Sequence, residues 1–138
     1  MLVFVAAVSV ALVFSFLCSI FESVLLSVRY SRVESLAQSG KRSGRLLRRF
    51  KQDIDTPIAA ILIVNTVAHT VGASVAGASY SNVFDPQTLW IFTIVFTIAV
   101  LLFTEIIPKT VGVTYSDLLA TPVAYGIQAF TVALKPLV

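Results

Sequence analysis

Three long runs without acidic or basic residues constrain this chain more than any other feature of its sequence. No Asp, Glu, Lys or Arg occurs in residues 1–21, 56–80 or 86–104. A transmembrane helix needs about 20 mostly apolar residues, so each run is long enough to cross a bilayer. Only 12% of the residues are charged and 57% are hydrophobic, whereas soluble domains carry about 25% charge. The sequence therefore predicts a single all-α integral membrane domain over residues 1–138.

Hydropathy and helix breakers divide this domain into elements. The first run has no basic n-region, so we expect a retained helix rather than a cleaved signal peptide. The Ser39-Gly40 pair separates two short helical patterns and indicates a hairpin. The run 118–134 contains Pro122, Gly126 and Gln128; it fits a juxtamembrane helix or a short fourth span, and we expect the former. We predict transmembrane helices over about 2–28, 56–80 and 87–107, a cytoplasmic helical hairpin over about 29–55 and a C-terminal juxtamembrane helix over about 116–134.

The basic residues are concentrated in the predicted hairpin. Eight of the ten lysines and arginines lie between positions 29 and 51, which is the positive-inside signature of a cytoplasmic connection. We therefore expect a multi-pass protein of the inner (plasma) membrane, with the N-terminus outside and the basic loop and C-terminus cytoplasmic. The expected partner is the lipid bilayer and not nucleic acid, because no nucleic-acid-binding module is recognisable. Leu46, Leu47 and Phe50 recur at helical spacing among arginines, which fits a basic amphipathic hairpin against the membrane or a solvated charged loop.

Polar residues deep in apolar helices are costly unless they are satisfied, so their positions are informative. In the first helix Ser15, Ser19, Glu22 and Ser23 are spaced i, i+4, i+7 and i+8 and therefore share one helical face. With Arg29 at the cytoplasmic boundary, Glu22 lies about 10 Å inside the membrane, from a rise of 1.5 Å per residue. An ionised carboxylate at that depth needs a cation, a basic partner or water.

The second predicted helix carries Asn65, Thr66 and His69 near its middle. Asn65, His69 and Gly72 share a face, and small residues around Gly72 let a neighbouring helix approach closely. Two interpretations remain open for the amide and the imidazole. They either line a functional site or form interhelical hydrogen bonds that only hold the bundle together.

The third predicted helix ends in the string from Thr104 to Lys109, which contains Glu105 and Pro108. Proline has no N–H, so the carbonyl of Thr104 loses its i+4 partner, and Ile107 is expected to leave helical dihedral angles. A free carbonyl beside a carboxylate makes an oxygen-rich site on irregular backbone. The alternative is an ordinary Glu105–Lys109 pair beside an interfacial kink.

The three helices together offer carboxylates, hydroxyls, an amide and a free carbonyl. These are the hard oxygen ligands that Mg²⁺ and Ca²⁺ prefer, so the pattern favours a cation pathway. Enzymatic activity is not expected, because no nucleophile and base can be paired around the single histidine, and Cys18 lies in an apolar helix.

Two strings and one shorter segment resemble a known family. Residues 65–73, Asn-Thr-Val-Ala-His-Thr-Val-Gly-Ala, and residues 105–110, Glu-Ile-Ile-Pro-Lys-Thr, resemble the transmembrane domain of the CNNM/CorC family, also called DUF21. Residues 19–23 are similar to the Phe-Ser-x-Ser-Glu-Thr-Ala pattern of that family. The resemblance covers essentially the whole chain and implies a homodimeric Mg²⁺ transporter or exporter, with Na⁺ exchange as the driving force. Cytoplasmic CBS domains normally follow this domain in the family.

The resemblance also implies a set of site residues. The implied metal ligands are Ser19, Ser23, Asn65, Thr66, His69 and Glu105. Additional polar lining or hinge residues are Ser15, Glu22, Gly72, Thr104, Pro108 and Lys109.

Two positions depart from the family pattern. His69 stands where many members carry Asn, and Phe21 replaces a common Ser. Imidazole suits transition metals better than Mg²⁺, so His69 leaves the choice of divalent cation open. We expect a Na⁺-coupled Mg²⁺ transporter or exporter. The alternative is an ion-sensing membrane anchor that regulates an attached cytoplasmic domain without sustained transport.

Overall fold

The computed structural model describes residues 1–134 and 136, so residues 135, 137 and 138 of the predicted domain lie outside it. The described residues form helices and no strand, which confirms the all-α fold. The elements are α1 (Leu2–Ser27), α2 (Tyr30–Gln38), α3 (Arg42–Gln52), α4 (Asp55–Val83), the 3-10 turn η1 (Pro86–Thr88), α5 (Leu89–Val100), the π-helical segment η2 (Leu101–Ile106), α6 (Ile107–Thr114) and α7 (Ser116–Ala133).

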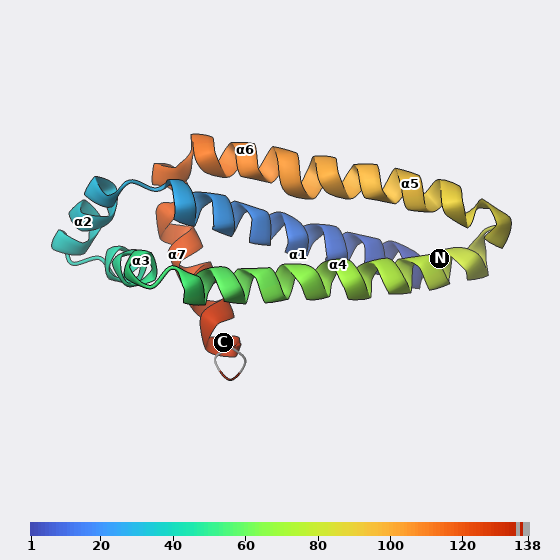
Figure 1. Ribbon diagram of the computed structural model, residues 1–138, viewed down its shortest axis with the longest axis horizontal. Helices are drawn as coiled ribbons and strands as arrows, with labels where there is room; N and C mark the ends of the chain where they lie inside the picture. Colours follow the sequence, from blue (N-terminus) through green and yellow to red (C-terminus); the bar gives the residue numbers. More distant parts are fainter. Residues whose placement is uncertain (135, 137–138) are drawn as a thin grey trace.

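Three helical segments of the described chain are long and apolar enough to cross a membrane. They are α1, α4 and the third span, which runs without a break through η1, α5, η2 and α6 from Pro86 to Thr114. At 26, 29 and 29 residues, each is about 40 Å long and exceeds the 30 Å hydrocarbon core. Figure 1 shows α1 between α4 and the third span, and α1 packs against both. Large apolar side chains such as Leu62, Trp90 and Ile98 remain exposed on the outside of the bundle, as lipid-facing residues do.

The third span differs from the prediction at Pro108. We expected Ile107 to leave helical geometry and the span to end near residue 107, but Ile107 has φ −64° and ψ −52° and the helix continues to Thr114. The reason is the wider turn of η2, in which the N–H of Ile107 bonds to the carbonyl of Leu102, five residues back. The proline then follows this wider turn at the start of α6, and the helix continues past it.

The two-helix hairpin is turned by Gly40, whose φ of +78° favours glycine. Leu46, Leu47 and Phe50 of α3 are buried in one core cluster with residues of α2 and α7. This apolar face therefore packs inside the protein, and neither of the two interpretations, a face against the membrane or a solvated loop, describes it. The exposed face of α3 carries basic residues such as Arg42, Arg45 and Arg49.

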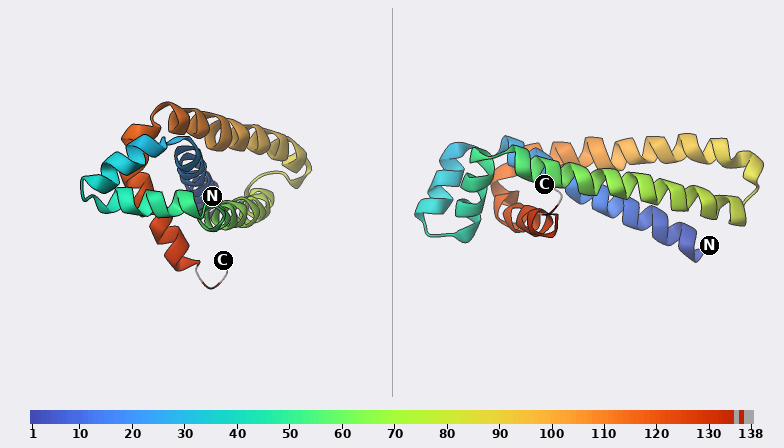
Figure 2. Two further views of the ribbon diagram at one scale, coloured as in Figure 1. Left: turned by 60° about the vertical axis from the view of Figure 1, so that its left-hand side comes forward. Right: turned by 60° about the horizontal axis from the view of Figure 1, so that its bottom comes forward.

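Helix α7 crosses the bundle at the hairpin end and does not run alongside the spans, as Figures 1 and 2 show. It is not among the three segments that could span a membrane. Its buried residues, Ala120, Val123, Ala124 and Ile127, pack on the ends of the other helices. This geometry suits a helix at the membrane interface. The N-terminus lies at the opposite end of the bundle.

Candidate functional site

The serine stripe of α1 is buried along its whole length and meets a different partner at each turn. Ser15, Ser19 and Ser23 are 0%, 1% and 6% exposed. Ser15 contacts α4, Ser19 contacts η2 and Ser23 packs against Gly112 of α6. Because α1 lies between α4 and the third span, the serines of this one face contact both of them. Polar groups on this face are therefore removed from lipid.

Ser15 joins the two polar residues of α4. Its hydroxyl donates to Oδ1 of Asn65 at 2.8 Å and also contacts Nε2 of His69. A hydroxyl has a single hydrogen. Because Ser15 donates that hydrogen to Asn65, the imidazole Nε2–H is the donor to Ser15. Asn65 and His69 are i and i+4 on α4, which explains how both reach one serine.

Ser19 holds the carbonyl that Pro108 leaves without its usual i+4 backbone donor. The Ser19 hydroxyl donates to the backbone oxygen of Thr104, the group whose helical partner would be the N–H of residue 108. The Thr104 side chain is 1% exposed and its hydroxyl donates to the carbonyl of Val100 at 2.5 Å. The predicted free carbonyl thus exists, but a side chain of α1 satisfies it.

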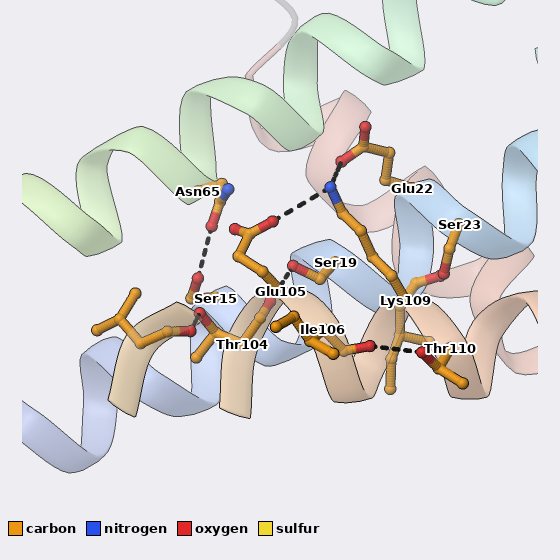
Figure 3. A network of polar contacts seen from close by, with 12 residues as sticks. Ser15, Ser19, Glu22, Ser23, Asn65, Thr104, Glu105, Ile106, Lys109 and Thr110 are labelled. Carbon is orange, nitrogen blue, oxygen red and sulfur yellow. Dashed lines mark hydrogen bonds and ion pairs between the residues drawn. The ribbon is translucent and has the colours of Figure 1, made fainter. Parts of the chain in front are cut away.

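Three charged groups follow these contacts toward the hairpin end. Nζ of Lys109 lies 3.1 Å from Oε2 of Glu105 and 3.9 Å from Oε2 of Glu22. The side chains are partly exposed, at 44%, 27% and 36% respectively. Figure 3 shows the ammonium between the two carboxylates, with Glu105 on the side toward Asn65. The i, i+4 pair expected as one alternative is present, and it includes a second acid from another helix.

A cavity of about 470 Å³ lies beside Glu105. Its polar walls come from His69 of α4, Thr97 of α5 and Glu105 of η2, and Ala11 of α1 also lines it. We did not single out Thr97 from the sequence. The spacing of Thr93, Thr97 and Thr104, all on the third span, was the available signal, because residues four and seven apart share a helical face.

Other predicted residues have different surroundings. Thr66 is exposed, and its side chain makes no hydrogen bond within residues 1–134 and 136. The Ser23 hydroxyl donates to the carbonyl of Ile20 in its own helix at 3.1 Å. Gly72 is buried where a Cβ would meet Ala11, so it sets the close approach of α1 and α4. Pro108 is buried at the start of α6.

The chemistry available here is that of hard oxygen ligands. Across the described ranges no group of three or more His, Cys, Asp or Glu side chains is placed to hold a metal ion. The oxygens belong instead to Ser19, Asn65, Glu105 and the Thr104 carbonyl. The hydroxyl, amide and carbonyl oxygens each keep a lone pair beyond their present hydrogen bond. Such oxygens bind Mg²⁺ or Ca²⁺ in preference to soft metals.

Comparison with known proteins covers nearly all of the chain. The family described as the cyclin M transmembrane N-terminal domain matches residues 6–138. The UPF0053 protein sll1254 of Synechocystis is 32% identical over 138 residues, which is 100% of this chain and 40% of that protein. The UPF0053 inner membrane protein YfjD of Escherichia coli is 24% identical over 117 residues, 85% of this chain and 27% of its own. The chain therefore spans less than half the length of these relatives.

Proposed function

The chain belongs to the family of cyclin M transmembrane N-terminal domains, and on that premise we propose that it is the membrane domain of a divalent-cation transporter whose substrate is Mg²⁺. The direction we propose is export from the cytoplasm, driven by exchange with Na⁺. The observation that carries the proposal is the carboxylate of Glu105, which lines a cavity between apolar spans. A carboxylate placed among membrane spans is expensive and marks an ion pathway by default.

The backbone beside Glu105 supports the same function. Irregular backbone at membrane depth is tolerated only when it is buried in protein or lines a cavity, and π-helical turns occur frequently at functional sites. Here the π turn η2 contains both Thr104 and Glu105. It brings a backbone carbonyl and a carboxylate of adjacent residues toward α1 and the cavity.

We propose that the cation binds to oxygens of Ser19, Asn65 and Glu105, with the Thr104 carbonyl as a further ligand. His69 supports this set rather than joining it, since its Nε2 is engaged by Ser15. Ser23 lies against α6, and its hydroxyl oxygen is a further ligand for a cation that approaches that helix. Thr66 stays outside the set, because it lies on the exposed side of α4.

The arrangement in the membrane follows from the charges. The hairpin carries most of the basic residues, so we place the hairpin and α7 at the cytoplasmic side of the plasma (inner) membrane and the N-terminus outside. For a homodimer we propose the open side of α4, where Gly77 has no heavy atom within 4 Å of an added Cβ. The relatives extend well beyond this chain, and we propose that CBS domains occupy part of that length.

Flux into proteoliposomes tests the proposal. A Mg²⁺-sensitive dye inside the vesicles reports uptake by the wild-type chain, with and without a Na⁺ gradient. Glu105→Gln removes the carboxylate while keeping its shape and is expected to abolish uptake, and Asn65→Ala is expected to lower it at least tenfold. Glu34→Gln is the matched control, because Glu34 pairs with Arg48 in the hairpin at 3.5 Å, away from the cavity. Its uptake should equal that of the wild type.

The outcomes separate three roles. Uptake that survives Glu105→Gln refutes the proposed pathway. Saturable Mg²⁺ binding without flux identifies an ion-sensing membrane anchor instead of a transporter. A chain that binds no Mg²⁺ is a structural subunit.

A further inference from the structure

Lys109 connects two acidic residues that come from different spans. Its ammonium lies 3.1 Å from a carboxylate oxygen of Glu105, on its own span, and 3.9 Å from one of Glu22 on α1. These two ion pairs are the only polar contacts of the ammonium within the described part of the chain. An isolated i, i+4 pair on a helix surface would not recruit an acid from a second helix. Lys109 therefore occupies a two-carboxylate position beside the proposed cation site (Figure 3).

The charge balance at this position decides what happens when a divalent cation arrives. With Lys109 between them, the two carboxylates and the ammonium have a net charge of minus one. Adding a divalent ion while the lysine stays would leave an excess positive charge at this position, which is unfavourable. If the lysine leaves, the two carboxylates and the divalent ion are neutral.

The lysine side chain is able to leave. Its four-carbon stem is flexible, and a lysine near a helix end can extend its ammonium toward the interface while the stem stays on apolar surface. Lys109 lies in α6, toward the hairpin end of the third span, and its side chain is 44% exposed. The ammonium thus has a route out of the pair.

We propose that Lys109 is an internal counter-ion, which occupies the place between Glu22 and Glu105 in the empty state and is displaced when the divalent cation binds. The inference rests on the proposed function and adds a specificity-determining residue to it. A monovalent ion offers the carboxylates no more charge than the ammonium already supplies, so it gains nothing by displacing the lysine. A divalent ion supplies more charge and therefore gains by displacing the lysine. Lys109 therefore lowers the affinity of this position for every cation, and only a divalent ion gains by displacing it.

Binding measurements on the purified chain in lipid nanodiscs test the inference without relying on transport. Calorimetric titration with MgCl₂ gives the dissociation constant of the wild type, Lys109→Gln and Lys109→Arg. We expect Lys109→Gln to bind Mg²⁺ at least tenfold more tightly and to become sensitive to 100 mM NaCl. Lys109→Arg keeps the charge and should stay near the wild type. Lys51→Gln is the matched control, because it removes one positive charge from the hairpin, where Lys51 lies over the ring of Tyr30.

A chemical restoration of the charge covers the case in which Lys109→Gln folds poorly. Lys109→Cys can be modified with an aminoethyl thiosulfonate, which restores an ammonium, or with a hydroxyethyl reagent, which is neutral. The native Cys18 is fully buried and is replaced by alanine in the background. The ammonium adduct should bind Mg²⁺ at least tenfold more weakly than the neutral adduct, in the same folded variant.

The results distinguish this inference from the function beneath it. If the wild type binds Mg²⁺ and removal of the charge at 109 leaves the affinity equal or weaker, Lys109 only positions Glu105. The counter-ion role is then overturned while the transporter proposal stands. If the wild type shows no saturable Mg²⁺ binding, the proposed function fails and the inference fails with it.

Discussion

Replacing Ser19 by alanine tests how the third span tolerates its proline. The Ser19 hydroxyl is the donor to the Thr104 carbonyl, and Pro108 supplies no N–H to that carbonyl. In Ser19→Ala the carbonyl therefore loses the hydroxyl donor in a buried place, with no N–H at position 108 to replace it, since Thr104 is 1% exposed. An unsatisfied buried group costs about 1–3 kcal/mol, and interhelical hydrogen bonds in membrane proteins contribute about 0.6–1.7 kcal/mol. We expect Ser19→Ala to lower the free energy of unfolding by about 1–2 kcal/mol.

A double-mutant cycle isolates the proposed cause. Pro108→Ala restores an N–H four residues after Thr104, so the carbonyl no longer depends on Ser19. In that background the loss caused by Ser19→Ala should shrink by about 1 kcal/mol. The assay is reversible unfolding in mixed micelles with a chelator present, followed by helical circular dichroism. Ser81→Ala is the control, because Ser81 donates to the carbonyl of Gly77 in its own helix at 3.3 Å.

The cycle has a clear negative result. Independent sites add within about 0.3–0.5 kcal/mol. If the losses for Ser19→Ala in the two backgrounds agree within that margin, the serine does not replace the missing proline N–H.

Three further predictions follow from individual contacts. Gly112→Val should lower the free energy of unfolding by about 1–3 kcal/mol through overpacking, because a Cβ there would meet Ser23 and the Ile20 carbonyl. The micelle assay measures the change, again with Ser81→Ala as the control. Arg29→Gln breaks the 2.9 Å pair with Asp117, but the side chains are 74% and 40% exposed, so the loss should stay below about 1 kcal/mol and vanish in 1 M salt. Thr97→Val removes the hydroxyl that α5 contributes to the cavity wall and should reduce Mg²⁺ flux several-fold with an unchanged unfolding midpoint; equal flux would remove Thr97 from the pathway.

The spans and the burial of the serine stripe were predictable from the sequence for physical reasons. A run without charges long enough to cross a bilayer has few alternatives, because the backbone must satisfy itself in lipid. A polar stripe at helical spacing must likewise find protein, and Ser15 and Ser19 are buried against two different helices. The family motif included Thr66 with Asn65, but adjacent residues lie about 100° apart around a helix. Of these two residues, only Asn65 contacts α1.

Tertiary contacts account for what the sequence left open. The sequence shows that position 108 has no N–H, but it does not specify whether the chain leaves the helix there or widens one turn. A donor from another helix was needed to hold the carbonyl, and the identity of that donor depends on how α1 lies against the third span. The second acid beside Lys109 was hidden for the same reason, because Glu22 is 87 positions away in the chain.

The polar groups of the third span depend on α1 in a way that couples them. In a regular helix the carbonyl of Thr104 would bond to the amide at 108, and Glu105 would pair with Lys109 alone. Proline removes the first partner and Glu22 shares the second, so both contacts now involve α1, at Ser19 and at Glu22. These two residues are three apart on one helical face. A shift of the third span against α1 therefore releases the Thr104 carbonyl and loosens the lysine pair together. On the proposed function, the same movement would expose two cation ligands at once.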